Sequence, residues 1–236
     1  GYCEAITFAF LSEAELKRWG MADSTIALAN PLSADLAVMR TSLLPGLAAA
    51  LVRNQNRQAG RVRLFELGRS YKAGSAGPTE TELLSLIVNG AARPEQWGEG
   101  ARAVDFYDVK GDIEALLAQS GCGDDYRWIE GGPDCLHPGR RAQLVVGAEV
   151  VGWIGALHPE LARQLDLDGE VLVAELSLAA VRSRQMPKAR ELSRFPSVRR
   201  DLALVLPETV RFDALKACVE VAAGSLLREL RLFDVY

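Results

Sequence analysis

Hydrophobic and polar residues alternate in short runs over much of this 236-residue chain, a pattern that predicts more strands than helices. Aromatic and β-branched residues over 2–10 predict a first strand. Ser12 and Glu15 follow with the spacing of a capping box, and Gly20 is expected to end that short helix. Further alternating or apolar runs predict strands at residues 62–67, 83–88, 142–146, 150–157 and 171–176.

The first of these runs has polar residues between its apolar ones, which predicts one covered face and one exposed face. The covered face would carry Val62, Leu64 and Leu67, and the exposed face Arg61, Arg63 and Glu66. The Gly, Ser, Ala and Pro residues of 73–78 predict a loop before the next strand.

Leucines at helical spacing predict the longest helix of the first half. Ser42 can cap it, and the pattern is lost at 54–57. Its apolar stripe would consist of Leu43, Leu44, Leu47 and Leu51. A second helix is expected at 113–119, closed by Gly121, and a short third one after Pro159.

Strands that outnumber helices without strict alternation favour an α+β fold, with a mixed, mainly antiparallel sheet and flanking helices. A polar linker over 182–191 predicts a boundary between a domain at 1–190 and a second one at 191–236. In the second domain we expect a strand at 201–206, a strand at 226–236, and between them a helix at 212–223. Phe212, Leu215 and Val219 of that helix would point inward. This order is half of a ferredoxin-like unit.

The composition, with 49% hydrophobic and 25% charged residues, is typical of a globular protein. The net charge of −4 does not favour nucleic-acid binding, but residues 182–200 hold seven basic residues and the single acid Glu191. This segment is either a phosphate-attracting region or a solvated linker.

Four scattered cysteines indicate neither a disulfide framework nor a zinc site, which favours a reducing cytoplasmic location. No apolar run is long enough to cross a membrane, and the missing initial methionine is typical of a piece of a longer chain.

Several short motifs together cover nearly the whole chain: Asn-Pro-Leu-Ser at 30–33, Met-Arg-Thr-Ser-Leu-Leu-Pro at 39–45, Leu-Phe-Glu-Leu-Gly-Arg at 64–69, Asp-Phe-Tyr-Asp-Val-Lys-Gly-Asp at 105–112, Leu-His-Pro-Gly-Arg at 136–140, Gly-Trp-Ile-Gly-Ala-Leu-His-Pro at 152–159, Phe-Pro at 195–196, Arg-Asp-Leu-Ala at 200–203 and Leu-Phe-Asp-Val-Tyr at 232–236. In this order, the motifs resemble the C-terminal half of the bacterial phenylalanyl-tRNA synthetase β subunit.

The resemblance implies a catalytically silent class II synthetase-like domain, followed by part of a ferredoxin-like anticodon-binding domain. In that family an α subunit activates phenylalanine with ATP and magnesium, and α and β form an (αβ)2 heterotetramer that binds tRNA. The editing domain, the N-terminal tRNA-binding domain and the acidic residues that share magnesium with α would precede Gly1. No catalytic residue, cofactor or metal site is therefore expected in this chain, and no membrane partner.

The class II strand at 64–69 would normally continue into an arginine that grips the ATP α-phosphate at two points. Here Lys72 stands at that place, and small residues replace the acidic partner. The resemblance therefore implies a scaffold without nucleotide chemistry.

Candidate contact residues come from two motifs. The motif at 30–45 belongs in the family to the subunit-interface region, which implies Asn30, Pro31, Arg40, Leu43 and Leu47 as interface residues. Packing and capping, or anion binding at a helix start, are the other interpretations of Arg40, Thr41 and Ser42. For RNA, the candidates are Phe195, which can stack on a base, and Arg199 and Arg200, which can contact phosphate. Phe195 could instead seat the second domain on its linker.

The two histidines, His137 and His158, each precede a proline, and we expect each imidazole to satisfy a backbone carbonyl rather than bind metal. Glu66 and Glu175 could form a carboxylate pair for acid-base work, but pairing of each with a basic group such as Arg69 is favoured. Two other functions stay open at this point: an autonomous ATP-dependent adenylating enzyme of the class II superfamily, and a stand-alone RNA-binding module.

Overall fold

The computed structural model describes residues 1–120, 126–182 and 194–235. Contacts within the chain divide it into two compact units, Gly1–Lys188 and Ala189–Tyr236. The expected domain boundary between 190 and 191 lies outside the described residues, as do Gly121 and all of the expected linker except Arg182. Each unit is described by itself below.

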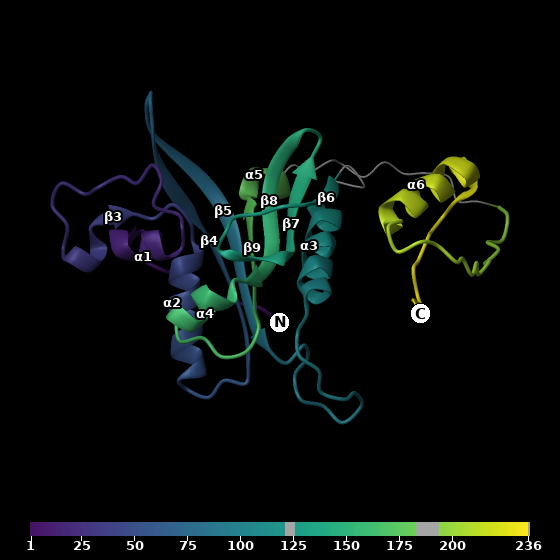
Figure 1. Cartoon of the computed structure of the whole chain (residues 1–236), viewed down its shortest axis with the longest axis horizontal. Helices are drawn as coiled ribbons and strands as arrows, with labels where there is room; N and C mark the ends of the chain where they lie inside the picture. Colours follow the sequence, from purple (N-terminus) through teal and green to yellow (C-terminus); the bar gives the residue numbers. More distant parts are fainter. Residues whose placement is uncertain (121–125, 183–193, 236) are drawn as a thin grey trace. The chain divides into compact units, whose positions relative to one another are not determined.

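The first unit is built on a seven-stranded sheet with the order β1-β4-β5-β9-β8-β7-β6 (Figure 1). The β1–β4 pair is parallel and the other neighbouring pairs are antiparallel. A separate antiparallel pair joins β2 to β3. The strands are β1 (Cys3–Glu4), β2 (Phe10–Leu11), β3 (Val38–Met39), β4 (Arg61–Gly74), β5 (Gly77–Gly90), β6 (Tyr126–Glu130), β7 (Leu136–Val146), β8 (Glu149–Leu157) and β9 (Val171–Ser177). The expectation of a mixed, mainly antiparallel sheet is confirmed.

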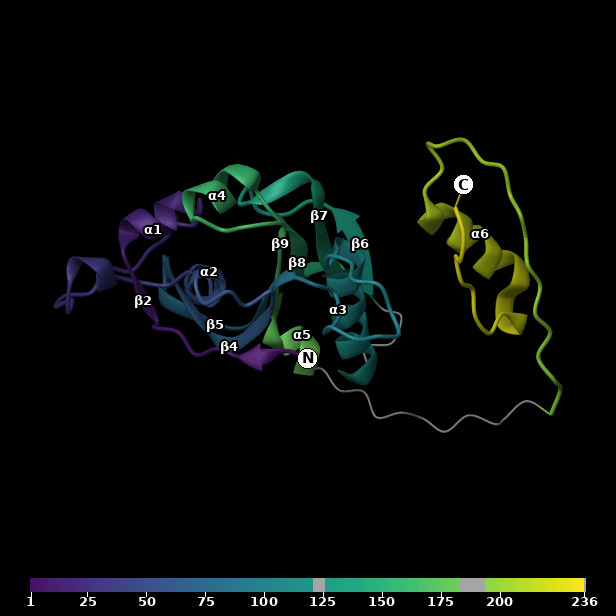
Figure 2. The same cartoon turned by 90° about the horizontal axis from the view of Figure 1, so that it is seen from below.

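Helices cover both faces of this sheet (Figure 2). On one face, which we call the α2 face, Leu44, Leu47 and Leu51 pack with apolar strand residues such as Ile87 and Val173. The opposite face packs against Val109, Ile113 and Leu117 of α3. The helices of this unit are α1 (Glu13–Arg18), α2 (Leu44–Gln55), α3 (Phe106–Ser120), α4 (Pro159–Gln164) and α5 (Leu178–Arg182), with a 3-10 turn, η1 (Ala34–Leu36).

The long β4–β5 hairpin differs from the expected strand, loop and strand. Pairing runs without a break from Arg61 opposite Gly90 to Gly74 opposite Gly77, so the residues expected to form a loop at 73–78 continue the strands around a tight turn. The assignment of covered and exposed faces expected for the strand at 62–67 is also wrong at the C-terminal end of that strand. Glu66 is buried and Leu67 is 48% exposed, because the two-residue period that starts at Val62 continues through Glu66.

The expected strand at 2–10 is split into β1 and β2, which belong to different sheets. The residues between them pass over the start of α2. Helix α3 begins seven residues earlier than expected, because Asp105 caps it. The Asp105 Oδ1 atom accepts the backbone N–H groups of Tyr107 and Asp108 at 2.8 and 3.0 Å, and the Asp108 carboxylate accepts the Asp105 N–H in return.

In the second unit, α6 (Phe212–Ala223) has the expected bounds, and a 3-10 turn, η2 (Gly224–Leu226), follows it. The strands expected at 201–206 and 226–236 are absent from the described residues of this unit, which end at 235. No residue in 194–235 is buried, and Phe212, expected to point inward, is 38% exposed. An alternating run forms a strand only when another strand pairs with it, and none is present within 194–235.

Candidate functional site

A row of polar side chains crosses the α2 face of the sheet. Glu66 of β4 pairs with Ser85 of β5, and Ser85 pairs with Glu175 of β9. Residues paired directly on neighbouring strands project to the same face, so the three side chains lie side by side. All three are buried. Buried carboxylates in the middle of a sheet need compensating donors, and the neighbouring segments supply them.

Glu66 is paired with Arg40, which enters from the segment before α2. Arg40 Nη1 donates to Glu66 Oε1 at 2.7 Å, and its Nε donates to the carbonyl oxygen of Arg69 at 2.9 Å. The Thr7 hydroxyl donates to the other carboxylate oxygen, Oε2, at 2.7 Å. Glu66 thus pairs with a basic group as expected, although that group is Arg40 and not Arg69. Both partners are nearly fully buried, so the pair is part of the domain interior.

Glu175 is held by neutral donors of β5 and of the start of α2, and not by a basic group as expected. Its Oε2 atom accepts hydrogen bonds from the Ser85 hydroxyl at 2.7 Å, the Ser42 hydroxyl at 2.8 Å and the Leu43 backbone N–H at 3.0 Å. Burial raises the pKa of Glu175, and these three hydrogen bonds oppose that rise. Ser42 also accepts the Leu44 N–H at 3.2 Å, but the N-cap residue of α2 is Leu43 and not Ser42 as predicted.

The two carboxylates do not form a catalytic pair. Ser85 separates them in the row, which puts their strands about 10 Å apart. Each also receives its hydrogen bonds from its own chain, so neither is presented to a substrate. The row therefore fixes α2 and the segment before it onto the sheet.

The cationic residues at the expected nucleotide position lie on the β4–β5 hairpin. Arg69 is exposed and forms ion pairs with Glu80 at 3.1 Å and Glu82 at 3.8 Å, both on β5. Lys72 is exposed near the end of the same hairpin. Among residues 1–120, 126–182 and 194–235, no three His, Cys, Asp or Glu side chains gather as a metal site would require.

Both histidines contact backbone groups next to their prolines. His137 Nδ1 accepts the N–H of Gly139 at 3.1 Å, and His158 Nδ1 accepts the N–H of Glu160 at 3.2 Å. The second of these bonds caps α4. The imidazoles contact the backbone as expected, but the bonded group is an N–H in each case and not the expected carbonyl.

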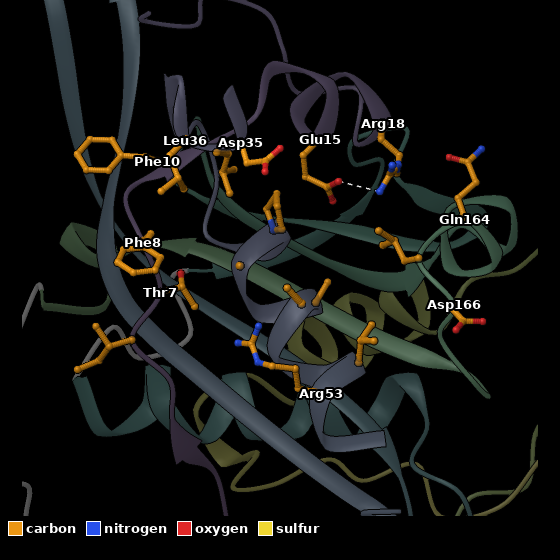
Figure 3. Close-up of a pocket in the computed structure, with 18 residues that line it drawn as sticks. Thr7, Phe8, Phe10, Glu15, Arg18, Asp35, Leu36, Arg53, Gln164 and Asp166 are labelled. Atoms are coloured by element: carbon orange, nitrogen blue, oxygen red, sulfur yellow. Dashed lines mark hydrogen bonds and ion pairs between the residues drawn. The ribbon is translucent and has the colours of Figure 1, made fainter. Parts of the chain in front are cut away.

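The surface above α2 contains an open apolar groove of about 780 Å³. Figure 3 shows α2 along its floor, with Phe8 and Phe10 on one side and Gln164 and Asp166 on the other. Ile6 is 88% exposed and Phe8 73% exposed. The lining residues are Ile6, Thr7, Phe8, Phe10, Leu11, Glu15, Arg18, Asp35, Leu36, Pro45, Gly46, Ala48, Ala49, Val52, Arg53, Gln164, Leu165 and Asp166.

The residues predicted for a subunit interface separate into two groups. Asn30 and Pro31 are exposed, in the segment that leads to η1. Arg40, Leu43 and Leu47 are buried inside the first unit, with Leu43 and Leu47 at 0% exposure. The side chains of these three pack against their own domain, so a partner that binds here would meet the groove and the exposed loop instead.

The residues predicted for RNA contact are all exposed. Phe195 is 84% exposed, and Arg199 Nε lies 3.3 Å from the Asp201 carboxylate in an exposed ion pair. Arg200 is exposed beside them. They lie close together along the chain, before α6.

Comparison with known proteins decides the family. The model of the phenylalanyl tRNA synthetase beta chain CLM domain matches residues 1–178, and the ferredoxin-fold anticodon binding domain matches residues 193–236. The chain belongs to the phenylalanyl-tRNA synthetase β-chain family. It is 49% identical over 99% of its length to the "Phenylalanine--tRNA ligase beta subunit" of Xanthomonas campestris pv. campestris (strain 8004). It is 45% identical over its whole length to the protein of the same name from Pseudomonas fluorescens (strain Pf0-1).

The chain spans about 30% of the length of these β-chain relatives. The class II fold is shown by a pyrrolysyl tRNA synthetase of Desulfitobacterium hafniense. That structure matches with a TM-score of 0.57 at 12% identity, over 77% of this chain and 60% of its own. In the parts of the chain that the structure describes, no helix has the length and apolarity needed to cross a bilayer.

Sequence reasoning missed the residues that organise this site. Thr7 and Ser85 gave no signal, because one hydroxyl in a strand is compatible with either face. The position of Glu66 could have been found by continuing the period from Val62, which puts it on the covered face. A buried glutamate there would then have required a buried cation, and Arg40 is the one that supplies it.

Proposed function

We propose that this chain supplies the catalytically silent class II-like domain of a phenylalanine–tRNA ligase β subunit, which docks on the α subunit. The whole enzyme would attach phenylalanine to its tRNA with ATP and magnesium, as a cytoplasmic (αβ)2 heterotetramer. The residues from 194 onward would belong to the module that binds the tRNA anticodon. The family membership and the relatives' name, β subunit, support a partner α subunit.

One observation carries the silent role. On the α2 face, where the polar groups of the sheet gather, the hydrogen bonds that Glu66 and Glu175 accept come from Thr7, Arg40, Ser42, Leu43 and Ser85 of this same chain. Arg69 on the hairpin is already paired with glutamates of β5. A domain whose polar groups satisfy each other is suited to holding shape and poorly suited to binding a triphosphate.

The apolar groove supports the docking role. Exposed large apolar residues such as Ile6 and Phe8, next to a concave apolar surface, are typical of protein–protein contacts. Asn30 and Pro31 remain part of the proposed interface because they are exposed. Leu47 is not a suitable test residue, because an aspartate at a fully buried position would destabilise the domain itself.

The test of assembly is coexpression of the chain with the α subunit, followed by native mass spectrometry. The proposal expects a complex that contains both polypeptides. In that complex, replacing Ile6 and Phe8 together by Asp should weaken association at least tenfold. The melting temperature should stay nearly unchanged, since both side chains are exposed. Val150→Asp is the matched control, because Val150 is 49% exposed and lies outside the groove. Equal loss in the control and the double variant would contradict the proposed surface.

For tRNA, we propose that Phe195, Arg199 and Arg200 take part in anticodon binding by the complete module. Reversal of Arg199 and Arg200 to Glu in the full-length assembly should weaken tRNA binding. It should also lower the slope of log K against log salt concentration by about 0.7–0.9 for each phosphate that the variant no longer neutralises. An unchanged slope would contradict phosphate contact by Arg199 and Arg200.

The alternative of an autonomous adenylating enzyme predicts measurable ATP binding without the α subunit. Lys72 would then have to replace the phosphate-binding arginine, although it is an exposed residue of β4 and a point charge without a planar fork. Isothermal titration of ATP into the isolated chain should give no binding heat in the silent-domain proposal. A saturable heat would favour the alternative.

A further inference from the structure

Residues 5–9 connect two sheets, and the outward-facing residues of this segment line the groove. Ile6 and Phe8 are exposed, whereas Ala5, Thr7 and Ala9 are half-buried, the alternation of an extended strand. Yet the segment is not part of either sheet, since β1 ends at Glu4 and β2 begins at Phe10. Its register must therefore be fixed by something other than a continuous strand ladder.

Hydrogen bonds hold every second residue of the segment. The Ala5 N–H donates to the Phe65 carbonyl at 2.8 Å, and the Ala9 carbonyl accepts the Arg40 N–H at 2.9 Å. Between them, the Thr7 N–H donates to Glu66 Oε1 at 3.3 Å. A buried side chain thus replaces the missing neighbouring strand at the middle position.

The Thr7 side chain adds two further bonds. Its hydroxyl donates to Glu66 Oε2 at 2.7 Å and accepts from Arg40 Nη1 at 3.0 Å, so it joins both members of the buried ion pair. On its other side lies Gly46 of α2. A Cβ atom at Gly46 would overlap Thr7 Oγ1 and lie 2.7 Å from Thr7 Cβ. The segment can approach the helix this closely because residue 46 has no side chain.

We infer that Thr7 is a positioning residue: its bonds to Glu66 and Arg40 set the register of residues 5–9, so that Ile6 and Phe8 face the partner. The inference rests on the proposed function, since it assigns this surface to the α subunit. A slip by one residue would turn Thr7 outward and direct Ile6 or Phe8 toward the buried ion pair. Thr7, which lies between Ile6 and Phe8, disfavours that register. In the slipped register an apolar side chain would replace the hydroxyl that donates to Glu66, and the buried carboxylate would lose a hydrogen bond.

The test compares three substitutions in the full chain. Thr7→Val removes the hydroxyl and keeps the shape, Thr7→Ser keeps the hydroxyl, and Ser85→Ala is the matched control. Ser85, like Thr7, donates a hydroxyl to a buried carboxylate at 2.7 Å, but it does not line the groove. Thr7→Val and Ser85→Ala are therefore expected to lower the melting temperature to a similar extent.

The first measurement is amide hydrogen exchange on the isolated chain. Thr7→Val should speed exchange in residues 5–9 at least fivefold, and Ser85→Ala and Thr7→Ser should leave that segment unchanged. The second is affinity for the α subunit, which Thr7→Val should reduce about tenfold, with Thr7→Ser within twofold of the wild type. A fourth substitution, Gly46→Ala, should give the same loss of affinity as Thr7→Val, although alanine favours a helix more than glycine does.

The outcomes separate the two proposals. An unchanged rate of amide hydrogen exchange in residues 5–9 of Thr7→Val would overturn the positioning role, whatever the affinity of the variant for the α subunit. Faster exchange with unchanged affinity, or an equal loss of affinity in Ser85→Ala, would show that the anchor does not serve docking, and so would also overturn the inference. Failure of the wild-type chain to bind the α subunit, with the exchange result as expected, would refute the docking proposal and the docking part of the inference, but not the positioning of residues 5–9.

Discussion

The Ser85 hydroxyl lies 2.7 Å from Glu175 Oε2, across two neighbouring strands and beneath the start of α2. Glu175 is buried, and burial raises the pKa of its carboxyl group. An acid with a raised pKa in the folded state binds more protons there than in the unfolded state. Its contribution to stability therefore falls as the pH rises from the ordinary glutamate range through the raised pKa.

Glu175→Gln should remove this pH dependence. We expect the difference in unfolding free energy between the two proteins to shift in favour of the variant as the pH rises from about 4.3, the ordinary glutamate pKa. Urea denaturation at a series of pH values from 4 to 8 measures that difference. A constant difference across the series would mean that Glu175 keeps an ordinary pKa.

Arg40→Met should destabilise the first unit by about 3–5 kcal/mol, because it leaves the Glu66 charge buried without its cation. Addition of Glu66→Gln to this variant should recover part of the loss, since the unpaired charge is then gone. Urea unfolding of the wild type, Arg40→Met, Glu66→Gln and the double variant forms the required cycle. If the double variant loses as much as the sum of the single ones, the two side chains are not coupled.

Asp105→Ala should cost about 1 kcal/mol, because it removes the acceptor for two N–H groups at the start of α3. For a unit of this size the melting temperature should fall by about 2–4 °C. Asp105→Asn, which keeps a capping oxygen, serves as the control and should lose much less. Equal losses would mean that the cap is not the reason for the early start of α3.

Two glycine-to-alanine substitutions should have opposite effects. A Cβ at Gly152 would lie 2.7 Å from the backbone oxygen of Glu175 and would overlap Leu176 Cδ2, so alanine there should destabilise by about 1–3 kcal/mol. A Cβ at Gly111, within α3, would have no neighbouring atom within 4 Å, and alanine should stabilise by up to about 1 kcal/mol. Thermal melts of both variants give the sign directly.

Much of the fold follows from local pattern. The α6 bounds, the buried stripe of α2 and the Ser12 cap of α1, whose hydroxyl accepts the Glu15 N–H at 3.1 Å, were all predictable. Each of these depends on spacing within one helix, which the sequence carries directly. The core of the sheet was also predictable, since residues 83–88 form an apolar run that Ser85 alone interrupts.

The site was not predictable in the same way, because it depends on contacts between distant segments. The cation that compensates Glu66 is Arg40, which is 26 residues away, and Glu175 meets Ser42 across 133 residues. The polar outer halves of β4 and β5 resemble a loop, and the pairing between the two strands is what makes them a hairpin. The run at 201–206 shows the reverse case: it has strand character and no partner strand within 194–235.

All four tryptophans of the chain, Trp19, Trp97, Trp128 and Trp153, belong to the first unit, whereas residues 194–235 bury no side chain. Fluorescence therefore follows the unfolding of the first unit alone. The variants discussed above can be compared by their emission in the whole chain, without truncation, and the signal of each will report the sheet and its two layers of helices.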